Sequence, residues 1–463
     1  MFSLMHVVDR PGYRKECFLS DLQTHPERKI IMSSHNDSPR AWVRETAIFL
    51  TSQMFTLFGS SLVQYAILWY ITLETKSGLM VTISAISGFL PAFILSPFAG
   101  VWADRYDRKK LIILSDIGIA AATLVLAIFL MAGFEALWLM FVLSAVRSVG
   151  SGIQTPAVNA LLPQLVPQDK LTRVNGINYS LQSGLMLIAP VASGALMSMT
   201  SLQNLLFIDI VTAVVAVAIL VLFLRVKPHE KALQKQEAGY FEDLKLGFSY
   251  IHQHRFILHF FVFYAIIMFL IAPSAFLTPL QVTRTFSGTY WHLTVIEVVF
   301  FVGMLAGGGV MAAWGGMKNR IHTIALSGGV IGFGTLALGL VPTFWGYALF
   351  LALIGISIPA YNTPSMVLIQ ETVDENYMGR VFGVMSMLSS AMMPLGMMFF
   401  GPVSDRIAIE WIMIVTGALV VLLSGGMILD RVLVAAGKQK VPVATSPDEF
   451  AEVEAESQAK ESE

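Results

Sequence analysis

Three ionisable residues lie inside long apolar stretches of the sequence, where a charge is expensive to bury. They are Arg147 in SAVRSVGSG, Asp209 in LLFIDIVTAV and Glu297 in LTVIEVVFFVG. Inside a membrane such residues are rare and commonly belong to a proton or substrate pathway. We therefore interpret all three as candidates for proton coupling. The alternatives are a structural ion pair for Arg147, a structural role near the membrane surface for Asp209, and a peripheral acid for Glu297.

A cluster of charged residues also interrupts the apolar sequence at GVWADRYDRKK, from Gly100 to Lys110. Between Asp104 and Lys110 only Tyr106 is uncharged, and no charge precedes the cluster back to Ser77. Bases alone are typical of a membrane edge, but an acid at the end of an apolar helix needs a cation or the N-terminus of another helix beside it. By helical spacing we expect Asp116 to reach back to Lys110 and support this cluster.

The composition indicates a membrane protein. Of 463 residues 55% are hydrophobic and 13% are charged, about half the charged share of a soluble domain. The single cysteine, Cys17, excludes an internal disulfide, and neither a phosphate-binding loop nor a metal-ligand motif is present. We therefore expect no enzyme, no cofactor, no metal and no nucleic-acid partner.

Apolar runs long enough to cross a bilayer as helices predict an all-α membrane protein with twelve spans. The spans are expected at 46–72, 79–103, 111–132, 137–162, 174–199, 204–224, 256–281, 291–316, 321–341, 345–369, 380–403 and 410–430.

The distribution of Lys and Arg predicts the orientation. Most of the 30 basic residues fall on the terminal tails and the even-numbered loops, whereas Lys76, Arg284 and Arg406 fall on the other side. By the positive-inside rule both termini are cytoplasmic, in a multi-pass protein of the cell inner (plasma) membrane.

The sequence also predicts two homologous halves, because TPAVNALLPQLVPQDKLTRVNG (155–176) parallels TPSMVLIQETVDENYMGRVFG (363–383). Such repeats are common in transporters, with a binding site at the interface of the halves. We expect two pseudo-symmetric six-helix bundles. The predicted domains are an N-terminal tail (1–45) that could start at Met1 or Met32, bundles at 46–225 and 256–431, a linker with an amphipathic helix in its second half (226–255), and an acidic disordered tail (432–463).

The charged loop resembles the signature G-x-x-x-D-R-x-x-R-[KR] of the major facilitator superfamily. The resemblance implies that Asp104 is a latch that holds the cytoplasmic gate closed, with Arg108 as a partner and GRVFG, beginning at Gly379, as the docking helix start. The gating motif then comprises Gly100, Asp104, Arg105, Arg108, Lys109, Gly379 and Arg380. In the second half GVMAAWGGMKNR keeps only a remnant of the signature, because Ala313 stands where the acid would fall.

A second resemblance concerns APVASG, which is similar to the G-P-x-x-G-G core of the antiporter motif of the superfamily. Ala189, Pro190, Ser193 and Gly194 carry it. Ordinary packing of small residues between helices is the alternative explanation.

The first half contains LFGSSLVQYAILWYITLETKSG, GFLPAFILSPFAGVWADRYDRKKLIILSD and TPAVNALLPQLVPQDKLTRVNG. In these segments it resembles the macrolide efflux proteins and the related enterobactin exporter group, which implies export of drugs or metabolites driven by protons. The superfamily lines its cavity with helices 1, 4, 7 and 10, so Gln53, Gln64, Tyr361 and Asn362 are candidates for substrate contact. The leading hypothesis is proton-coupled efflux of amphipathic drugs such as macrolides by alternating access, by a monomer in the lipid bilayer. The alternatives are a dedicated exporter of one metabolite, such as a siderophore, and a ligand sensor without transport.

Overall fold

The computed structural model describes residues 41–224, 226 and 240–438. Within these residues it contains α-helices, one 3₁₀ helix and no β-strand. The predicted N-terminal tail before residue 41, with its two possible starts, lies outside the described residues, as do most of the linker and the tail after residue 438.

The first bundle contains six long helices. They are α3 (Ala41–Thr75), α4 (Gly78–Arg105), α5 (Arg108–Met131), α6 (Leu137–Leu165), α7 (Leu171–Met199) and α8 (Leu202–Phe223), with the 3₁₀ helix η1 (Gln168–Lys170) before α7. A linker helix, α9 (Tyr240–Gln253), precedes the second bundle, where a helix is predicted.

The second bundle contains the remaining helices. They are α10 (Arg255–Leu270), α11 (Ala272–Phe276), α12 (Thr278–Thr285), α13 (Tyr290–Trp314), α14 (Arg320–Leu338), α15 (Phe344–Thr372), α16 (Glu375–Val403), α17 (Ile409–Leu429) and the short α18 (Arg431–Ala436).

The first three helices of the second bundle follow one another through two breaks. Pro273 and Pro279 lie at the starts of α11 and α12, where a proline fits because its missing N–H is not needed. Hydrogen bonds still cross both breaks, from Ala275 N to Ile271 O (3.1 Å) and from Gln281 N to Leu277 O (2.8 Å). Eleven helices among the described residues are each long and apolar enough to cross a membrane, and α9 with α10 would make a twelfth, bent span. These helices confirm the predicted all-α membrane fold.

The predicted disorder of the C-terminal segment is wrong for its first residues. Asp430 accepts hydrogen bonds from Val432 N (2.8 Å) and Leu433 N (3.3 Å), and so caps α18. Asn319 Nδ2 then donates to Val434 O (2.9 Å) and holds α18 against the start of α14. The cap and this contact order residues that composition alone assigned to the tail.

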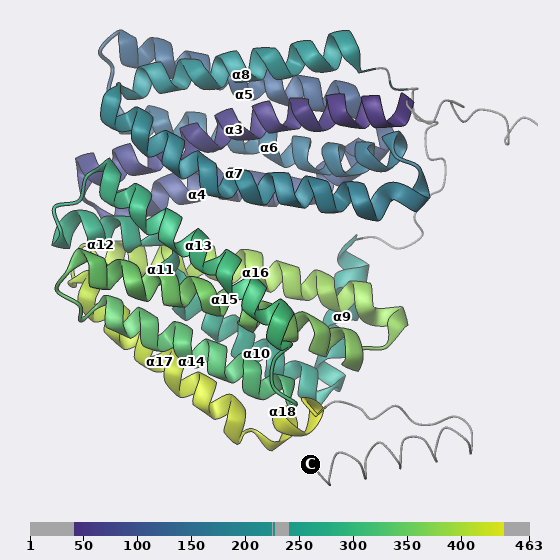
Figure 1. The fold of residues 1–463 in the computed structure, drawn as a ribbon, viewed down its shortest axis with the longest axis vertical. Coiled ribbons are helices and arrows are strands. Elements are labelled where there is room, and N and C mark those ends of the chain that lie inside the picture. Colours follow the sequence, from purple (N-terminus) through teal and green to yellow (C-terminus); the bar gives the residue numbers. More distant parts are fainter. Residues whose placement is uncertain (1–40, 225, 227–239, 439–463) are drawn as a thin grey trace, which may run out of the picture.

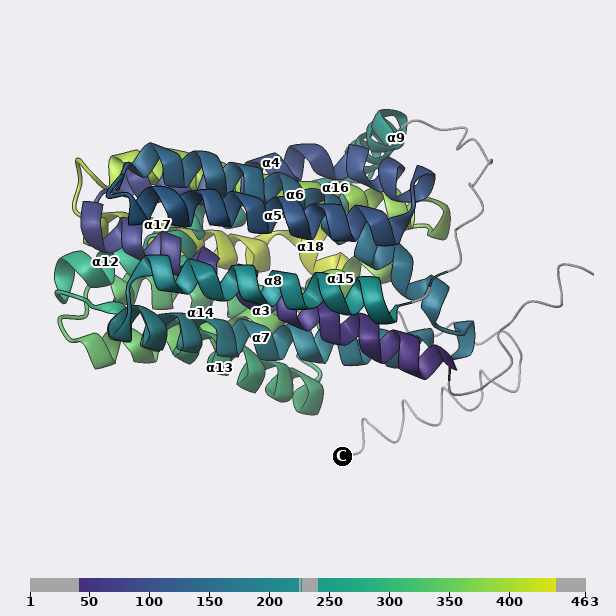
Figure 2. The same cartoon turned by 90° about the horizontal axis from the view of Figure 1, so that it is seen from above.

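The two bundles lie side by side with their helices along a common direction (Figures 1 and 2). We call the end where α3 begins and α9 lies the linker end, and the end with the α3–α4, α12–α13 and α16–α17 connections the far end. Helices α3, α4 and α7 of the first bundle meet α12, α16 and α13 of the second. Large apolar side chains such as Leu222 and Leu429 are exposed on the outside, as expected where lipid replaces water.

Candidate functional site

A cavity of about 330 Å³ lies between the bundles. Its walls come from α3, α4 and α6 of the first bundle and from α11 and α16 of the second. The walls combine hydroxyl groups with large apolar side chains, among them Ser60, Ser84, Ser144, Ser148, Ser389, Ser390, Phe89, Phe276, Met393 and Met397. Such a mixture suits a ligand with both apolar and oxygen-rich parts.

Arg147 is the one charged side chain among the described residues that line this cavity. Its Nη1 lies 2.5 Å from Asp209 Oδ2 of α8 and also contacts the Thr123 hydroxyl of α5. The Thr123 hydroxyl in turn donates to Asp209 Oδ2 (2.9 Å). The structure therefore pairs two residues that the sequence offered as separate proton-coupling candidates.

Close helix packing positions Arg147. One turn later on α6, a Cβ on Gly152 would collide with the backbone of Ala92 in α4. Between them, Ser148 Oγ accepts a hydrogen bond from Ala92 N (3.1 Å). The absence of a side chain at Gly152 thus lets α6 approach α4 and fixes the rotation of α6 that directs Arg147 inward.

The structure contradicts the link predicted between Asp116 and the charged loop. Asp116 is buried, and its Oδ1 accepts from Gln154 Nε2 of α6 (2.7 Å), whereas Lys110 is exposed. Spacing along one helix could not show that the neighbouring helix α6 supplies the partner.

The segment that resembles the antiporter motif holds three helices together. Ala189, Pro190, Ser193 and Gly194 are all buried in α7. The Ser193 hydroxyl donates to Leu62 O of α3 (3.1 Å), and a Cβ on Gly194 would overlap the Thr294 hydroxyl of α13. Because α13 belongs to the second bundle, this small-residue contact crosses the boundary between the bundles.

Glu297 lies on the same part of α13, one turn after Thr294. It is partly exposed and close enough to the Tyr65 hydroxyl of α3 to interact with it electrostatically. Glu297 does not line the cavity described above, but it lies at the same contact between α3, α7 and α13.

Of the four residues expected to contact substrate, only Gln64 lines the cavity. Gln53 is buried, Tyr361 is buried and stacks on Tyr264 (ring centroids 6.3 Å apart), and Asn362 is exposed on α15. Among the described lining residues, the second bundle contributes α11 and α16 and none from α15. In this conformation the tenth span lies away from the cavity, because α15 packs against α13 and α14, and contact of Tyr361 and Asn362 with substrate stays a prediction.

The bases of the signature loop bind carbonyl groups near helix C-termini. Arg108 donates to Ala103 O (2.9 Å) and Ala160 O (2.8 Å), and Lys109 Nζ donates to Leu224 O (2.8 Å). Cations are favourable at these negative helix ends. These contacts connect α5 to α4, α6 and α8.

The other gating residues lie on α4 and α16. Arg105 is exposed, and Asp104 lies in the last turn of α4, although its side chain is outside the described set. The docking helix begins at Glu375, one turn before Gly379, and Arg380 lies over the Tyr377 ring (5.5 Å). The latch role of Asp104 stays a prediction.

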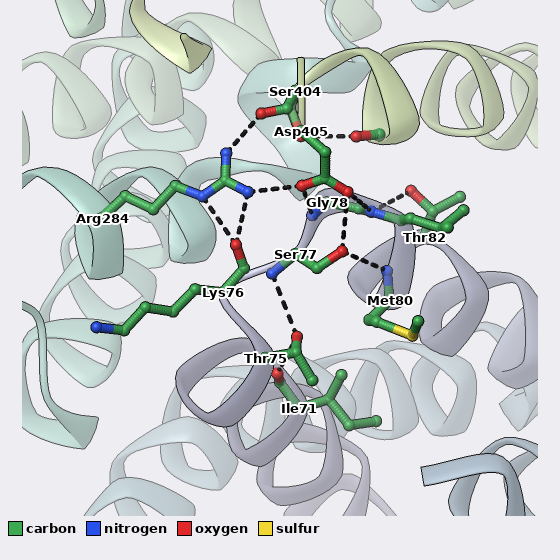
Figure 3. A network of polar contacts seen from close by, with 12 residues as sticks. Ile71, Thr75, Lys76, Ser77, Gly78, Met80, Thr82, Arg284, Ser404 and Asp405 are labelled. Carbon is green, nitrogen blue, oxygen red and sulfur yellow. Dashed lines mark hydrogen bonds and ion pairs between the residues drawn. The ribbon is translucent and has the colours of Figure 1, made fainter. Parts of the chain in front are cut away.

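The structure adds a polar network at the far end that sequence reasoning missed (Figure 3). Asp405, after α16, accepts hydrogen bonds from the Ser77 hydroxyl (2.8 Å), Gly78 N (2.7 Å) and Leu79 N (2.9 Å) at the start of α4. Burial opposes the charge, but these donors and Arg284 outweigh it and hold the pKa of Asp405 below its ordinary value. The network joins the two bundles at the far end.

Comparison with known proteins agrees with this architecture. The family model described as Major Facilitator Superfamily matches residues 49–397. Macrolide efflux protein A of Streptococcus pyogenes is 31% identical over 82% of this chain and 94% of its own length. The Staphyloferrin A transporter of Staphylococcus aureus is 22% identical over 78% of this chain and 89% of its own.

Among solved structures, a bacterial homologue of the human lysosomal transporter Spinster, in an inward-facing and unoccupied conformation, is similar in fold. It has a TM-score of 0.64 and 16% identity, and the match covers 88% of this chain and 100% of that one. The family match over most of its length shows that the chain belongs to the major facilitator superfamily of membrane transporters.

Proposed function

We propose that this transporter exports amphipathic drugs such as macrolides in exchange for protons, by alternating access of the cavity between its bundles. The observation that carries the proposal is the position of Arg147, which lines the cavity while paired with the buried Asp209. A charge at that place can link what occupies the cavity to the protonation of groups behind it.

The chemistry of the cavity supports the substrate class. Serine hydroxyls can bind the many oxygen atoms of a macrolide, and Phe89, Phe276 and Met393 offer apolar surface that adapts to different shapes. The similarity to a macrolide efflux protein over most of both chains supports the same class.

The direction of export follows from the orientation that we propose. Arg108 and Lys109 lie at the linker end, which the positive-inside rule places in the cytoplasm, with both termini. With the bundles held together at the far end by the contacts of Asp405 and Arg284, the cavity then receives its ligand from the cytoplasm or the inner leaflet. Rocking of the bundles would release the ligand on the other side.

The energy source in this proposal is the proton gradient, without a cofactor. Glu297 is the proton carrier, since it lies on α13, which packs against α7 of the first bundle, and interacts electrostatically with Tyr65 of α3. A carboxyl group at a moving interface can gain and lose a proton as that interface opens and closes. Because one chain carries both bundles, a monomer is sufficient.

Drug accumulation in cells tests the proposal. Cells expressing the protein should accumulate less of a macrolide and of amphipathic dyes than control cells, and a protonophore should abolish the difference. Glu297→Gln should lose export, whereas Glu135→Gln, which changes an exposed acid of the α5–α6 connection, should keep it. Unchanged accumulation across the panel in cells that contain the folded protein would refute drug efflux.

A second candidate is a dedicated exporter of an anionic metabolite such as a siderophore. It is favoured by the cavity wall, where the only charge among the described lining residues is the cation Arg147, and by the distant similarity to a siderophore transporter. Loss of siderophore secretion in a deletion strain, with normal macrolide export, would favour this candidate. Ligand binding by the purified protein without any flux would instead favour a sensor.

A further inference from the structure

Arg284 of α12 connects both sides of the far-end network. It donates from Nε and Nη2 to Lys76 O (2.9 and 2.6 Å), from Nη1 to Ser404 O (2.5 Å), and from Nη2 to Asp405 Oδ1 (2.6 Å). Lys76 belongs to the first bundle and Ser404 and Asp405 to the second. Lys76 has a left-handed backbone (φ 48°), so that α3 ends there and its carbonyl group is left for Arg284.

The negative carboxylate of Asp405 binds the positive N-terminal end of α4. The free N–H groups at the start of α4 form the positive end of the helix dipole. The carboxylate of Asp405 accepts hydrogen bonds from two of these N–H groups and from the hydroxyl of Ser77. Ser77 is itself the N-cap residue of α4. Hydrogen bonds to an ionised acceptor are among the stronger ones in proteins. The contact therefore holds the second bundle to the first at this end.

Glycines let α4 and α16 touch beneath this network. A Cβ on Gly401 would overlap Thr82 and approach Gly78 O (3.0 Å), and a Cβ on Gly78 would overlap Ser404. One turn deeper, the Thr82 hydroxyl donates to Met397 O (3.4 Å). The residue numbers of the pairs Gly78–Gly401 and Thr82–Met397 add up to the same total, as expected for two antiparallel neighbouring helices.

The same antiparallel register can be extended to the linker end. It places Gly100 of α4 opposite Gly379 of α16. In this structure no other described atom lies within 4 Å of where a Cβ on either glycine would be. The two helices thus touch at the far end and have open space beside the equivalent glycines at the linker end.

The sequence around Asp405 repeats the spacing of the signature loop. GPVSDR (401–406) and GVWADR (100–105) both read Gly-x-x-x-Asp-Arg, the first ending α16 at the far end and the second ending α4 at the linker end. In both, the glycine and the aspartate are four residues apart; Gly100 and Asp104 share one face of α4, whereas Asp405 lies in the turn that follows α16. Each helix therefore ends in an acid close to where its antiparallel neighbour begins.

We propose that Asp405, with Arg284, is a far-end latch that mirrors the signature loop, and that the two Gly-x-x-x-Asp-Arg segments close opposite ends of the cavity in turn. In the present conformation the far-end latch is engaged, with Gly401 against Gly78. Closing the linker end would bring Gly100 against Gly379, and the rocking that does so would part Gly401 from Gly78. This inference rests on alternating access in the proposed function, and it does not depend on the identity of the ligand.

Distances between spin labels test the latch without any transport assay. The full-length chain with Cys17→Ser would carry labels at the far end, on Phe134→Cys and Leu340→Cys, or at the linker end, on Lys170→Cys and Lys318→Cys. These four side chains are exposed. Distance distributions would be measured by double electron–electron resonance in lipid nanodiscs, without ligand.

Asp405→Asn should shift the ratio of far-end-open to far-end-closed molecules by about tenfold, as expected for the loss of a hydrogen-bonded charge. The linker-end distance should shorten in the same sample. Arg284→Gln should act in the same direction. Gly401→Val should also open the far end, by collision with Thr82 and without a change of charge.

Glu410→Gln is the matched control. Glu410 is also an acid at the far end, but the Thr285 hydroxyl that donates to it (2.7 Å) belongs to the second bundle, as Glu410 does. This variant should keep the wild-type distances. Monodisperse elution of each variant in size-exclusion chromatography shows that it is folded.

Three results would overturn the latch: wild-type distances in Asp405→Asn, equal shifts in Asp405→Asn and Glu410→Gln, or a shift in Asp104→Asn toward far-end opening. Opposite shifts in Asp405→Asn and Asp104→Asn would support the alternation of the two segments. Because no substrate is present, a failure of drug efflux would leave these distances unchanged, so the latch and the proposed function fail separately.

Discussion

Arg147 Nη1 lies 2.5 Å from Asp209 Oδ2, and this pair joins α6 to α8 inside the first bundle. Asp209 is almost fully buried and Arg147 nearly so. Each charge therefore depends on the other for compensation, since water cannot reach them freely. Because Arg147 also lines the cavity between the bundles, its pairing with Asp209 connects that cavity to the interior of the first bundle.

Asp209→Asn should destabilise the protein by about 3–5 kcal/mol, because it leaves the buried guanidinium unpaired. The double variant Arg147→Gln with Asp209→Asn should recover much of this loss, since no uncompensated charge remains. Thermal unfolding in detergent measures both, with the exposed Asp169→Asn as a variant that should match wild type. Equal unfolding temperatures for Asp209→Asn and wild type would show that the pair contributes no stability.

Glu297→Gln should separate exchange from proton-driven transport. Glutamine cannot carry a proton, so a pH gradient should no longer drive drug uptake into inverted vesicles, whereas exchange of labelled for unlabelled drug at equal pH should persist. Glu135→Gln should keep both activities. Uptake that still follows the pH gradient in Glu297→Gln would exclude this residue as the proton carrier.

The helices themselves could be predicted because the length of an apolar run is a local property of the sequence. The signature loop was equally accessible, since its residues are neighbours in the chain. The pairing of Arg147 with Asp209 was not, because it depends on how α6 and α8 rotate against each other. For the same reason the sequence could not show that Tyr361 and Asn362 lie away from the cavity in this conformation, because their apolar helix shows no preferred face by sequence.

The far-end network illustrates the same limit. By sequence Arg284 and Lys76 were only exceptions to the charge distribution, and Asp405 had no assigned role. Their meaning depends on contacts between residues far apart in the chain, such as Gly78 N with Asp405 Oδ1. The one sequence feature that could have indicated the network was the spacing Gly-x-x-x-Asp-Arg at 401–406. This spacing becomes informative only when α4 and α16 are known to be antiparallel neighbours.

Gly194→Ala should impair the contact between the bundles. A methyl group there would overlap the Thr294 hydroxyl and lie 3.3 Å from the Trp69 ring, and overpacking of this kind costs about 1–3 kcal/mol. Gly184→Ala, on the same helix with open space beside it, should be neutral or stabilising by up to about 1 kcal/mol. Thermal unfolding and drug transport of the two variants, compared directly, measure the effect. Equal behaviour would show that α7 and α13 can separate at no cost.

The far-end latch should be insensitive to pH until strongly acidic conditions. The donors to Asp405 hold its pKa below its ordinary value, so far-end closure is fully stabilised above the usual aspartate pKa of about 3.9 and loses this stabilisation as pH falls through the lowered pKa. The other charged groups at the far end near Asp405 are the bases Arg284, Lys76 and Arg406 and the acid Glu410, which accepts a hydrogen bond from the Thr285 hydroxyl. The far-end spin-label distance should therefore stay constant from about pH 8 to 5 and lengthen only below about pH 4. Glu410→Gln should leave this midpoint unchanged, whereas Asp405→Asn should abolish the transition; a midpoint near neutral pH would assign the switch to another group.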